Sequence, residues 1–165
     1  MNKSDILIRA ACKFYGEHEI LGNLGFENPV FQAIMERTGW KPPESWCAYF
    51  VEAVLRDAGF ESQASVISGS AVQTFKNCKA SMLFRVHSIP GNGDIVIWQD
   101  YINGIASWSG HAGIVIGMGK GMIATIEGNT NAEGGREGIE VAVKVRDPAY
   151  VPQTGLRVLG FISLV

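Results

Sequence analysis

The sequence is poor in charged residues and has no excess of basic ones. Asp, Glu, Lys and Arg make up 18% of the chain, and the formal net charge is −2. Binding to a phosphate backbone needs a basic surface, so this charge balance argues against nucleic acid as the main partner. With 47% hydrophobic residues, the composition is typical of a folded globular protein and not of a disordered one.

Cysteine is scarce, and its spacing excludes two common structural devices. Cys12, Cys47 and Cys78 are odd in number and include no C-x-x-C pair. The pattern therefore argues against a disulfide framework and against a structural zinc site. We expect the chain to be made in a reducing cytoplasm with at least one free thiol. Packing is the simplest role for Cys12 and Cys78.

Long apolar runs are also missing. No stretch approaches the roughly 18 uncharged apolar residues of a membrane-spanning helix, so we expect no membrane span and no membrane partner. The N-terminal M-N-K-S-D-I-L-I-R-A-A-C-K-F-Y has no continuous apolar segment and no small-residue cleavage site. This predicts that there is no secretory signal.

Helical patterns come first in the chain, and strand patterns follow. We expect residues 1–165 to form a single domain, with a helical part over about 1–80 and a sheet part over about 81–165. This order predicts an α+β fold in which N-terminal helices pack on a five- to six-stranded antiparallel sheet. The predicted helices lie at residues 4–15, between Asn28 and Gly39, between Ser45 and Gly59, and at about 70–76. The predicted strands lie at residues 83–89, 94–98, 111–117, 122–128, 139–147 and 156–165, with an aromatic-rich loop at 99–110.

The stretch E-S-W-C-A-Y-F-V-E-A-V-L-R-D-A-G predicts a helix that carries a cysteine in its first turn. Ser45 suits the N-cap and Gly59 the C-terminal stop, while Glu52 and Arg56 form an i,i+4 pair opposite the apolar face. Cys47 lies on the apolar face. A thiol at a helix N-terminus is close to the positive end of the dipole, which favours the thiolate. Cys47 is therefore a candidate nucleophile, with a small packing residue as the alternative.

A predicted hairpin supplies a candidate base for this thiol. His111 opens the strand H-A-G-I-V-I-G, and the chain returns through M-G-K-G to I-E-G-N-T-N. With a turn at residues 118–121, His111 lies opposite residue 128, beside Glu127 and Asn129. An imidazole there can accept the thiol proton, and either Glu127 or Asn129 could fix its tautomer. A slip of one residue would exchange the faces of the hairpin.

These blocks resemble the CHAP domain, a family of cysteine- and histidine-dependent amidohydrolases/peptidases of the papain-like clan that cut peptidoglycan. The resemblance is carried by W-C-A-Y-F, G-D-I-V-I-W, G-H-A-G-I-V-I-G and I-E-G-N-T-N, and it runs from about residue 15 to the C-terminus. E-G-N-T-N followed by a glycine-rich turn with Arg136 is similar to phage-lysin versions of the domain. The family implies a papain-like cell-wall peptidase architecture.

The resemblance also implies a role for each site residue. Cys47 would be the nucleophile, His111 the base and Glu127 the orienting acid. Asn129 would be a further polar partner of the imidazole or of the substrate, and the choice of third member between Glu127 and Asn129 stays open. The Cys47 backbone N–H would hold the oxyanion together with a second donor.

Four aromatic residues are candidate walls of a substrate groove, with core packing as the alternative for each. They are Trp46, Trp98, Tyr101 and Trp108. Some CHAP lysins carry an acidic calcium loop before the cysteine, but G-W-K-P-P-E-S-W has one acidic residue here. Calcium needs several oxygen ligands, so we predict no calcium and no other metal or cofactor.

The leading functional prediction is a bacteriolytic peptidoglycan hydrolase that cleaves an amide bond, of the phage endolysin type. It would be either an N-acetylmuramoyl-L-alanine amidase or a stem-peptide/cross-bridge endopeptidase. The alternatives are a secreted antibacterial amidase effector, a related thiol hydrolase that acts on another amide, and a non-enzymatic binding or virion-structural protein. We expect a monomer that acts on the cell wall after release or delivery. An immunity or inhibitor protein is an expected partner only of an effector.

Overall fold

A computed structural model describes residues 1–130 and 138–165. The predicted glycine-rich turn with Arg136 lies outside the described residues. The described helices are α1 (Lys3–Cys12), α2 (Pro29–Glu36), α3 (Cys47–Asp57), α4 (Glu61–Ala64) and α5 (Ala71–Ala80). The described strands are β1 (Glu19–Ile20), β2 (Gly25–Phe26), β3 (Phe84–His87), β4 (Ile95–Ile102), β5 (Ile105–Gly119), β6 (Met122–Thr130), β7 (Glu140–Arg146) and β8 (Gly155–Leu164).

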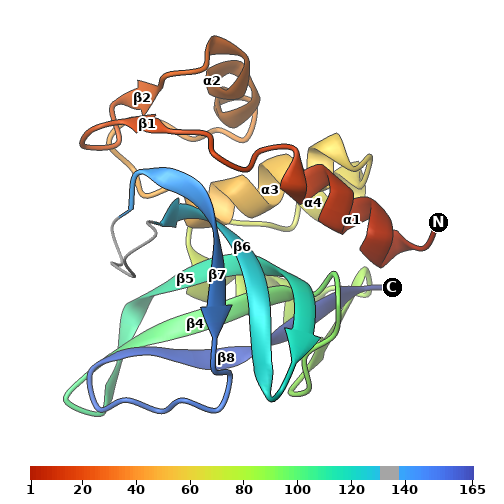
Figure 1. The fold of residues 1–165 in the computed structure, drawn as a ribbon, viewed down its shortest axis with the longest axis vertical. Coiled ribbons are helices and arrows are strands. Elements are labelled where there is room, and N and C mark those ends of the chain that lie inside the picture. The colour runs from red at the N-terminus through yellow and green to blue at the C-terminus, as the bar shows by residue number, and fades with distance from the viewer. Residues whose placement is uncertain (131–137) are drawn as a thin grey trace.

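Six of the described strands form one antiparallel sheet in the order β3-β8-β4-β5-β6-β7, and β1 pairs with β2 in a small second sheet. The large sheet is strongly curved, and α1, α2 and α3 lie together on one side of it (Figure 1). The predicted α+β fold with helices on an antiparallel sheet is therefore confirmed. Among the described helices, none is both long and apolar enough to cross a membrane.

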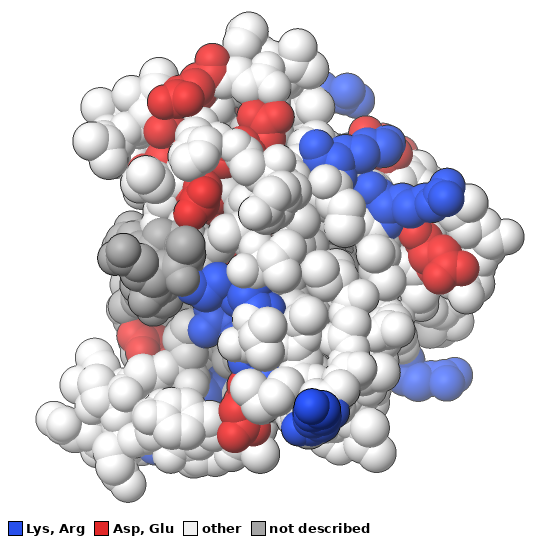
Figure 2. Space-filling model, viewed as in Figure 1, with Lys and Arg blue, Asp and Glu red and all other residues white. Residues whose placement is uncertain are grey.

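The surface carries charges of both signs. On the face shown in Figure 2, Lys and Arg side chains lie among Asp and Glu, and uncharged residues cover most of the area. Over the described residues, this face therefore has no continuous basic surface of the kind that binds a phosphate backbone.

Capping residues begin and end several helices as the sequence predicts. The Asn28 side chain accepts a backbone N–H in the first turn of α2, and Ser70 caps α5 in the same way. Gly59 follows α3 with φ +81, the left-handed conformation that a glycine C-cap supplies. The helix predicted at residues 70–76 is longer than expected and continues to Ala80.

The N-terminus of α3 differs from the prediction. Trp46 and not Ser45 occupies the N-cap position, and no side chain caps the first turn. The first N–H groups of a helix have no partner inside the helix, so an uncapped end leaves donors for another group. One of them, the Ala48 N–H, hydrogen-bonds to the Cys47 sulfur.

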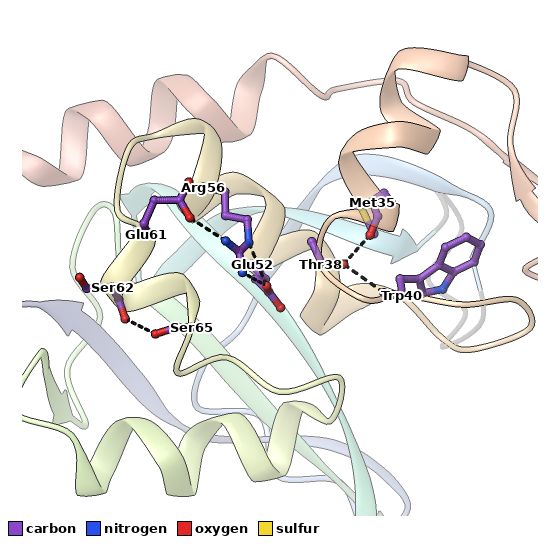
Figure 3. A network of polar contacts seen from close by, with 8 residues as sticks. All are labelled: Met35, Thr38, Trp40, Glu52, Arg56, Glu61, Ser62 and Ser65. Atoms are coloured by element: carbon purple, nitrogen blue, oxygen red, sulfur yellow. Dashed lines mark hydrogen bonds and ion pairs between the residues drawn. The ribbon is translucent and has the colours of Figure 1, made fainter.

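α3 is buried on most of its circumference, because α1, α2, α4, β5 and β6 all pack against it. The predicted Glu52–Arg56 ion pair is present at 2.8 Å, and Arg56 also contacts Glu61 at 2.6 Å (Figure 3). Glu52 is nevertheless only 6% exposed. Close by, the Thr38 hydroxyl donates to the Met35 carbonyl at the end of α2 (Figure 3). The side of α3 opposite its apolar face is therefore also covered.

The prediction of a loop at residues 99–110 is wrong. β4 and β5 continue through this segment as a hairpin, and its tip is Asn103-Gly104, with φ +52 and +79. Positive φ at both central residues is the geometry of a type I′ turn, for which Asn-Gly is the preferred pair. The aromatic residues of this segment are therefore strand residues.

We predict that Gly128→Ala destabilises the protein, because α3 packs directly on the backbone of β6 there. A Cβ at residue 128 would lie 2.6 Å from the Phe50 Cβ and 2.7 Å from the Trp46 ring. Overpacking of this kind costs about 1–3 kcal/mol in the free energy of unfolding, which urea denaturation measures. The matched control is Gly117→Ala in β5, where the nearest atom is 3.8 Å away. Equal losses in the two variants would contradict the prediction.

Candidate active site

The register of the β5–β6 hairpin places the candidate base and its partner on one face. The predicted register paired Ile114 with Thr125, but Ile114 pairs with Ile126, and a bulge follows between Val115 and Gly117. The turn is Lys120-Gly121 and not residues 118–121, because Gly119 already pairs with Met122, so the predicted pairing is two residues off next to the turn. The bulge adds one residue to β5 and removes one of these two, which leaves a difference of one residue at Ile114.

The corrected register explains how the Glu127 side chain is accommodated. Continued by one residue, it sets Gly113 opposite Glu127, on the face from which His111 projects. A Cβ at residue 113 would lie only 2.7 Å from the Glu127 Cγ. The glycine therefore leaves the space through which the carboxylate reaches the imidazole.

His111 and Glu127 form a buried hydrogen-bonded pair. The His111 Nε2 lies 2.8 Å from the Glu127 Oε2, and the two residues are 3% and 0% exposed. A carboxylate partner favours a proton on Nε2. This leaves Nδ1 for the Cys47 thiol, with which the imidazole shares a hydrogen bond. Trp98, the cross-strand neighbour of His111, lies beside the ring with a centroid distance of 5.7 Å.

Cys47 is the first residue of α3 and is 7% exposed. Burial by itself raises the pKa of the thiol, but the charge and hydrogen bond of His111 and the N–H groups of Ala112 and Ala48 together lower it below its ordinary value. Burial likewise opposes the His111 cation, yet Cys47 and Glu127 raise the pKa of the imidazole to about 9. Both shifts favour the thiolate–imidazolium form of the pair.

Glu127 has two further partners that sequence reasoning missed. Arg146 on β7 donates from Nε to Oε1 at 2.6 Å and from Nη2 to Oε2 at 2.5 Å, and the Thr125 hydroxyl donates to Oε1 at 2.5 Å. Burial alone would raise the pKa of Glu127, but Arg146 and His111 lower it to about 2. The alternation of β6 could have placed Thr125 on this face, whereas no local signal connects Arg146 with Glu127.

Cys47 and His111 open into a cleft of about 450 Å³ between α3, the segment before α5 and β5. Its lining residues are Glu44, Ser45, Cys47, Tyr49, Ser68, Gly69, Ser70, Ala71, Trp108, Ser109, Gly110, His111 and Asn129. Within the described part of the chain, no group of three or more His, Cys, Asp or Glu side chains is placed to hold a metal ion.

Asn129 lines the cleft but is not the hydrogen-bond partner of the imidazole Nε2, which contacts Glu127. It lies at a register irregularity between Glu127 and Thr130, with φ +53. The residue is 2% exposed, and among the described atoms its Oδ1 has no hydrogen-bond partner. An unpartnered buried amide oxygen on a residue that lines the cleft suits a contact with a bound ligand.

The predicted groove aromatics are divided between the cleft and the interior. Trp108 is 84% exposed and lines the cleft. Trp46 and Trp98 are 0% and 3% exposed and pack inside the protein, so we assign both to packing, the alternative that the sequence left open. Tyr101 lies under the Arg157 guanidinium, at 3.9 Å from its ring centroid, and is not among the cleft residues.

The other two cysteines lie away from the cleft. Cys78 is buried in the core, where burial raises the pKa of its thiol to about 12, as suits a packing residue. Cys12 ends α1 and is exposed, so its assignment to packing is wrong. Both thiols therefore serve as internal references for the reactivity of Cys47.

A comparison with family models gives a match to the CHAP domain over residues 38–129, more than half of the chain. The match includes Cys47, His111, Glu127 and Asn129. No curated protein and no solved structure matches the chain. The chain belongs to the CHAP domain family, the cysteine- and histidine-dependent amidohydrolases and peptidases of peptidoglycan.

Proposed function

We propose that this protein hydrolyses an amide bond of peptidoglycan with Cys47 as the nucleophile. The observation that carries the proposal is the hydrogen-bonded series of Cys47, His111 and Glu127 at a cleft. Nucleophile, base and orienting acid in this order are the arrangement that thiol acyl transfer requires. The phage-endolysin role rests on the resemblance of the E-G-N-T-N block and is part of the proposal.

Acylation follows from the charges of the pair. The Cys47 thiolate attacks the amide carbonyl carbon, and the carbonyl oxygen becomes the oxyanion of a tetrahedral intermediate. The His111 imidazolium then gives its Nδ1 proton to the amide nitrogen, the C–N bond breaks, and the amine leaves. The products of this step are a thioester on Cys47 and a neutral His111.

Deacylation uses the same groups in reverse. Neutral His111 takes a proton from water, and the oxygen of that water attacks the thioester carbonyl. The C–S bond breaks, which releases the carboxylic acid and restores the thiolate–imidazolium pair. Glu127 accepts the Nε2–H in both steps and so keeps Nδ1 directed at the reacting atoms.

The N-terminus of α3 offers the first part of an oxyanion site. The Cys47 N–H lies in the uncapped first turn of α3, where backbone N–H groups have no intrahelical partner. The positive end of the helix dipole stabilises negative charge at the same place. We therefore assign one oxyanion hydrogen bond to the Cys47 N–H.

The cleft has walls suited to a glycopeptide. Trp108, which is exposed, lines the cleft from β5, and Ser45, Ser68 and Ser70 line it from the segments before α3 and α5. Aromatic faces pack on sugar rings and on flat peptide bonds, while hydroxyls can both donate and accept hydrogen bonds. Such a lining fits a substrate that contains both sugar rings and peptide bonds.

The test is digestion of purified peptidoglycan by the wild type, with mass spectrometry of the released fragments and Cys47→Ala as the blank. Free muramic lactyl ends would identify an amidase, and cut stem peptides or cross-bridges an endopeptidase. We expect one of these fragment sets from the wild type and none from Cys47→Ala. No release from walls of several chemotypes, or equal release by the two proteins, would refute the proposal.

A further inference from the structure

Glu127 is a completely buried carboxylate between two cations. In the described part of the chain, the charged groups that face it are His111 from β5 and Arg146 from β7, and Cys47 of α3 lies on the other side of His111. Oε2 is shared between the His111 Nε2 at 2.8 Å and the Arg146 Nη2 at 2.5 Å. One negative charge therefore serves both cations.

Arg146 also determines how the carboxylate is turned. Its guanidinium contacts both oxygens of Glu127 through Nε and Nη2, and Thr125 adds a donor on Oε1. A planar fork of this kind fixes the plane of a carboxylate, which a single donor would leave free to rotate. The oxygen that reaches His111 is therefore held in position by Arg146.

Trp98 links the guanidinium and the imidazole. The Arg146 Cζ lies 4.8 Å from the Trp98 ring centroid, and the same ring is tilted by 33° against His111 at 5.7 Å. The Arg146 side chain is 21% exposed, so it extends from the edge of the sheet over Trp98 to the buried carboxylate. Stacking on an aromatic face limits the directions in which the guanidinium can move.

The proposed catalytic cycle explains why Glu127 needs Arg146 as a second cation. After His111 has protonated the leaving amine it is neutral, and without Arg146 the buried Glu127 would then have no cation beside it among the described residues. A buried unpaired carboxylate takes up a proton or moves toward water. Protonation would leave the Nε2–H only a neutral carbonyl oxygen as acceptor, and movement toward water would remove the acceptor altogether. In either case the imidazole would be oriented less firmly before water attacks the thioester.

We propose that Arg146 is a positioning residue of this site, which keeps Glu127 ionised and in place so that His111 holds its orientation in both protonation states. The inference rests on the proposed function. It concerns a residue outside the matched family segment, since Arg146 lies beyond residues 38–129.

The test compares Arg146→Gln and Arg146→Lys with Arg157→Gln. Arg157 is the matched control, because it also stacks on an aromatic ring, Tyr101, but donates to the Pro152 carbonyl and not to Glu127. We expect Arg146→Gln to lower kcat about 10–100-fold with little change in KM, the range seen when the partner that orients a functional histidine is lost. Arg146→Lys keeps the charge without the fork and should recover part of this loss.

A second readout is the pH dependence of Cys47 alkylation by iodoacetamide, which needs no peptidoglycan. Arg146 holds the pKa of Glu127 at about 2, so its loss raises this pKa. Glu127 then becomes protonated at a higher pH, the imidazolium loses its partner, and the thiolate is destabilised. The acid limb of alkylation should move to higher pH in Arg146→Gln and stay near the wild-type position in Arg146→Lys.

The outcomes separate this inference from the proposed function. An alkylation profile of Arg146→Gln that equals those of the wild type and Arg157→Gln would overturn the positioning role, whatever the substrate is. A shifted profile in a protein that releases no wall fragments would support the positioning role and refute the proposed substrate. If Arg146→Gln does not fold, Arg146→Lys decides: wild-type kcat would overturn the inference, and a reduced kcat with an unshifted acid limb would support it.

Discussion

Replacement of His111 by Ala is expected to lower peptidoglycan cleavage by about 10³-fold or more, because the proposed base and proton donor are lost together. The same change should slow the alkylation of Cys47 near neutral pH, since the His111 charge and hydrogen bond are the largest of the effects that lower the pKa of the thiol against burial. The rate of fragment release and the rate of iodoacetamide labelling measure the two effects separately.

Cys12 and Cys78 are the internal controls for this experiment. In the wild type, Cys47 should be labelled well before both, although Cys12 is exposed, and in His111→Ala this advantage should disappear. Slow and equal labelling of all three thiols in the wild type would contradict a reactive Cys47.

Wild-type activity should fall above about pH 9, where the imidazolium loses the proton that the leaving amine needs.

Replacement of Glu127 by Gln is expected to lower kcat by about 10²–10⁴-fold, because the acceptor that fixes the histidine tautomer is changed. The alkaline limb of activity should move to lower pH. Glu127 is one of the groups that raise the pKa of His111, and without its charge the imidazolium loses its proton earlier. Hydrolysis of peptidoglycan followed across the pH range measures both changes.

Asn129→Gly is the matched comparison, because glycine keeps the left-handed backbone at this position and removes only the side chain. Its Oδ1 has no partner among the described atoms and the residue lines the cleft, so we expect a higher KM with the pH profile unchanged. This pair of variants decides which residue orients His111. A large loss of kcat in Asn129→Gly beside a nearly unaffected Glu127→Gln would assign that role to Asn129 instead.

The proposed mechanism depends on a pair of opposite charges that burial alone would neutralise. Desolvation opposes the charged form of Cys47, of His111 and of Glu127. Each charge persists because an opposite charge or a hydrogen-bond donor lies beside it, and the last of these partners, Arg146, reaches water. The site is therefore best understood as a chain of alternating charges from the cleft to the edge of the sheet.

Local signals were enough to determine the helix and the hairpin that carry the candidate site. The apolar spacing and Gly59 bounded α3 with Cys47 in its first turn. The turn signal in M-G-K-G placed β5 beside β6 with His111 near Glu127, although the turn itself is only Lys120-Gly121. Such patterns depend on neighbours within a few residues, so a single sequence contains them. The Asn103-Gly104 turn was also a local signal, and the extended β4–β5 hairpin could have been predicted from it.

Only the tertiary structure decided which polar groups meet. A bulge after Val115 shifted the hairpin by one residue and brought Glu127 to the face of His111, with Gly113 leaving the space between them. Arg146 reached Glu127 from another strand, 19 residues away in sequence. The sequence by itself determined the thiol, the imidazole and the elements that carry them, because these follow from short-range periodicity and turn chemistry. Register, burial and the partners of a buried charge depend on how distant segments pack, and this depends on the whole chain.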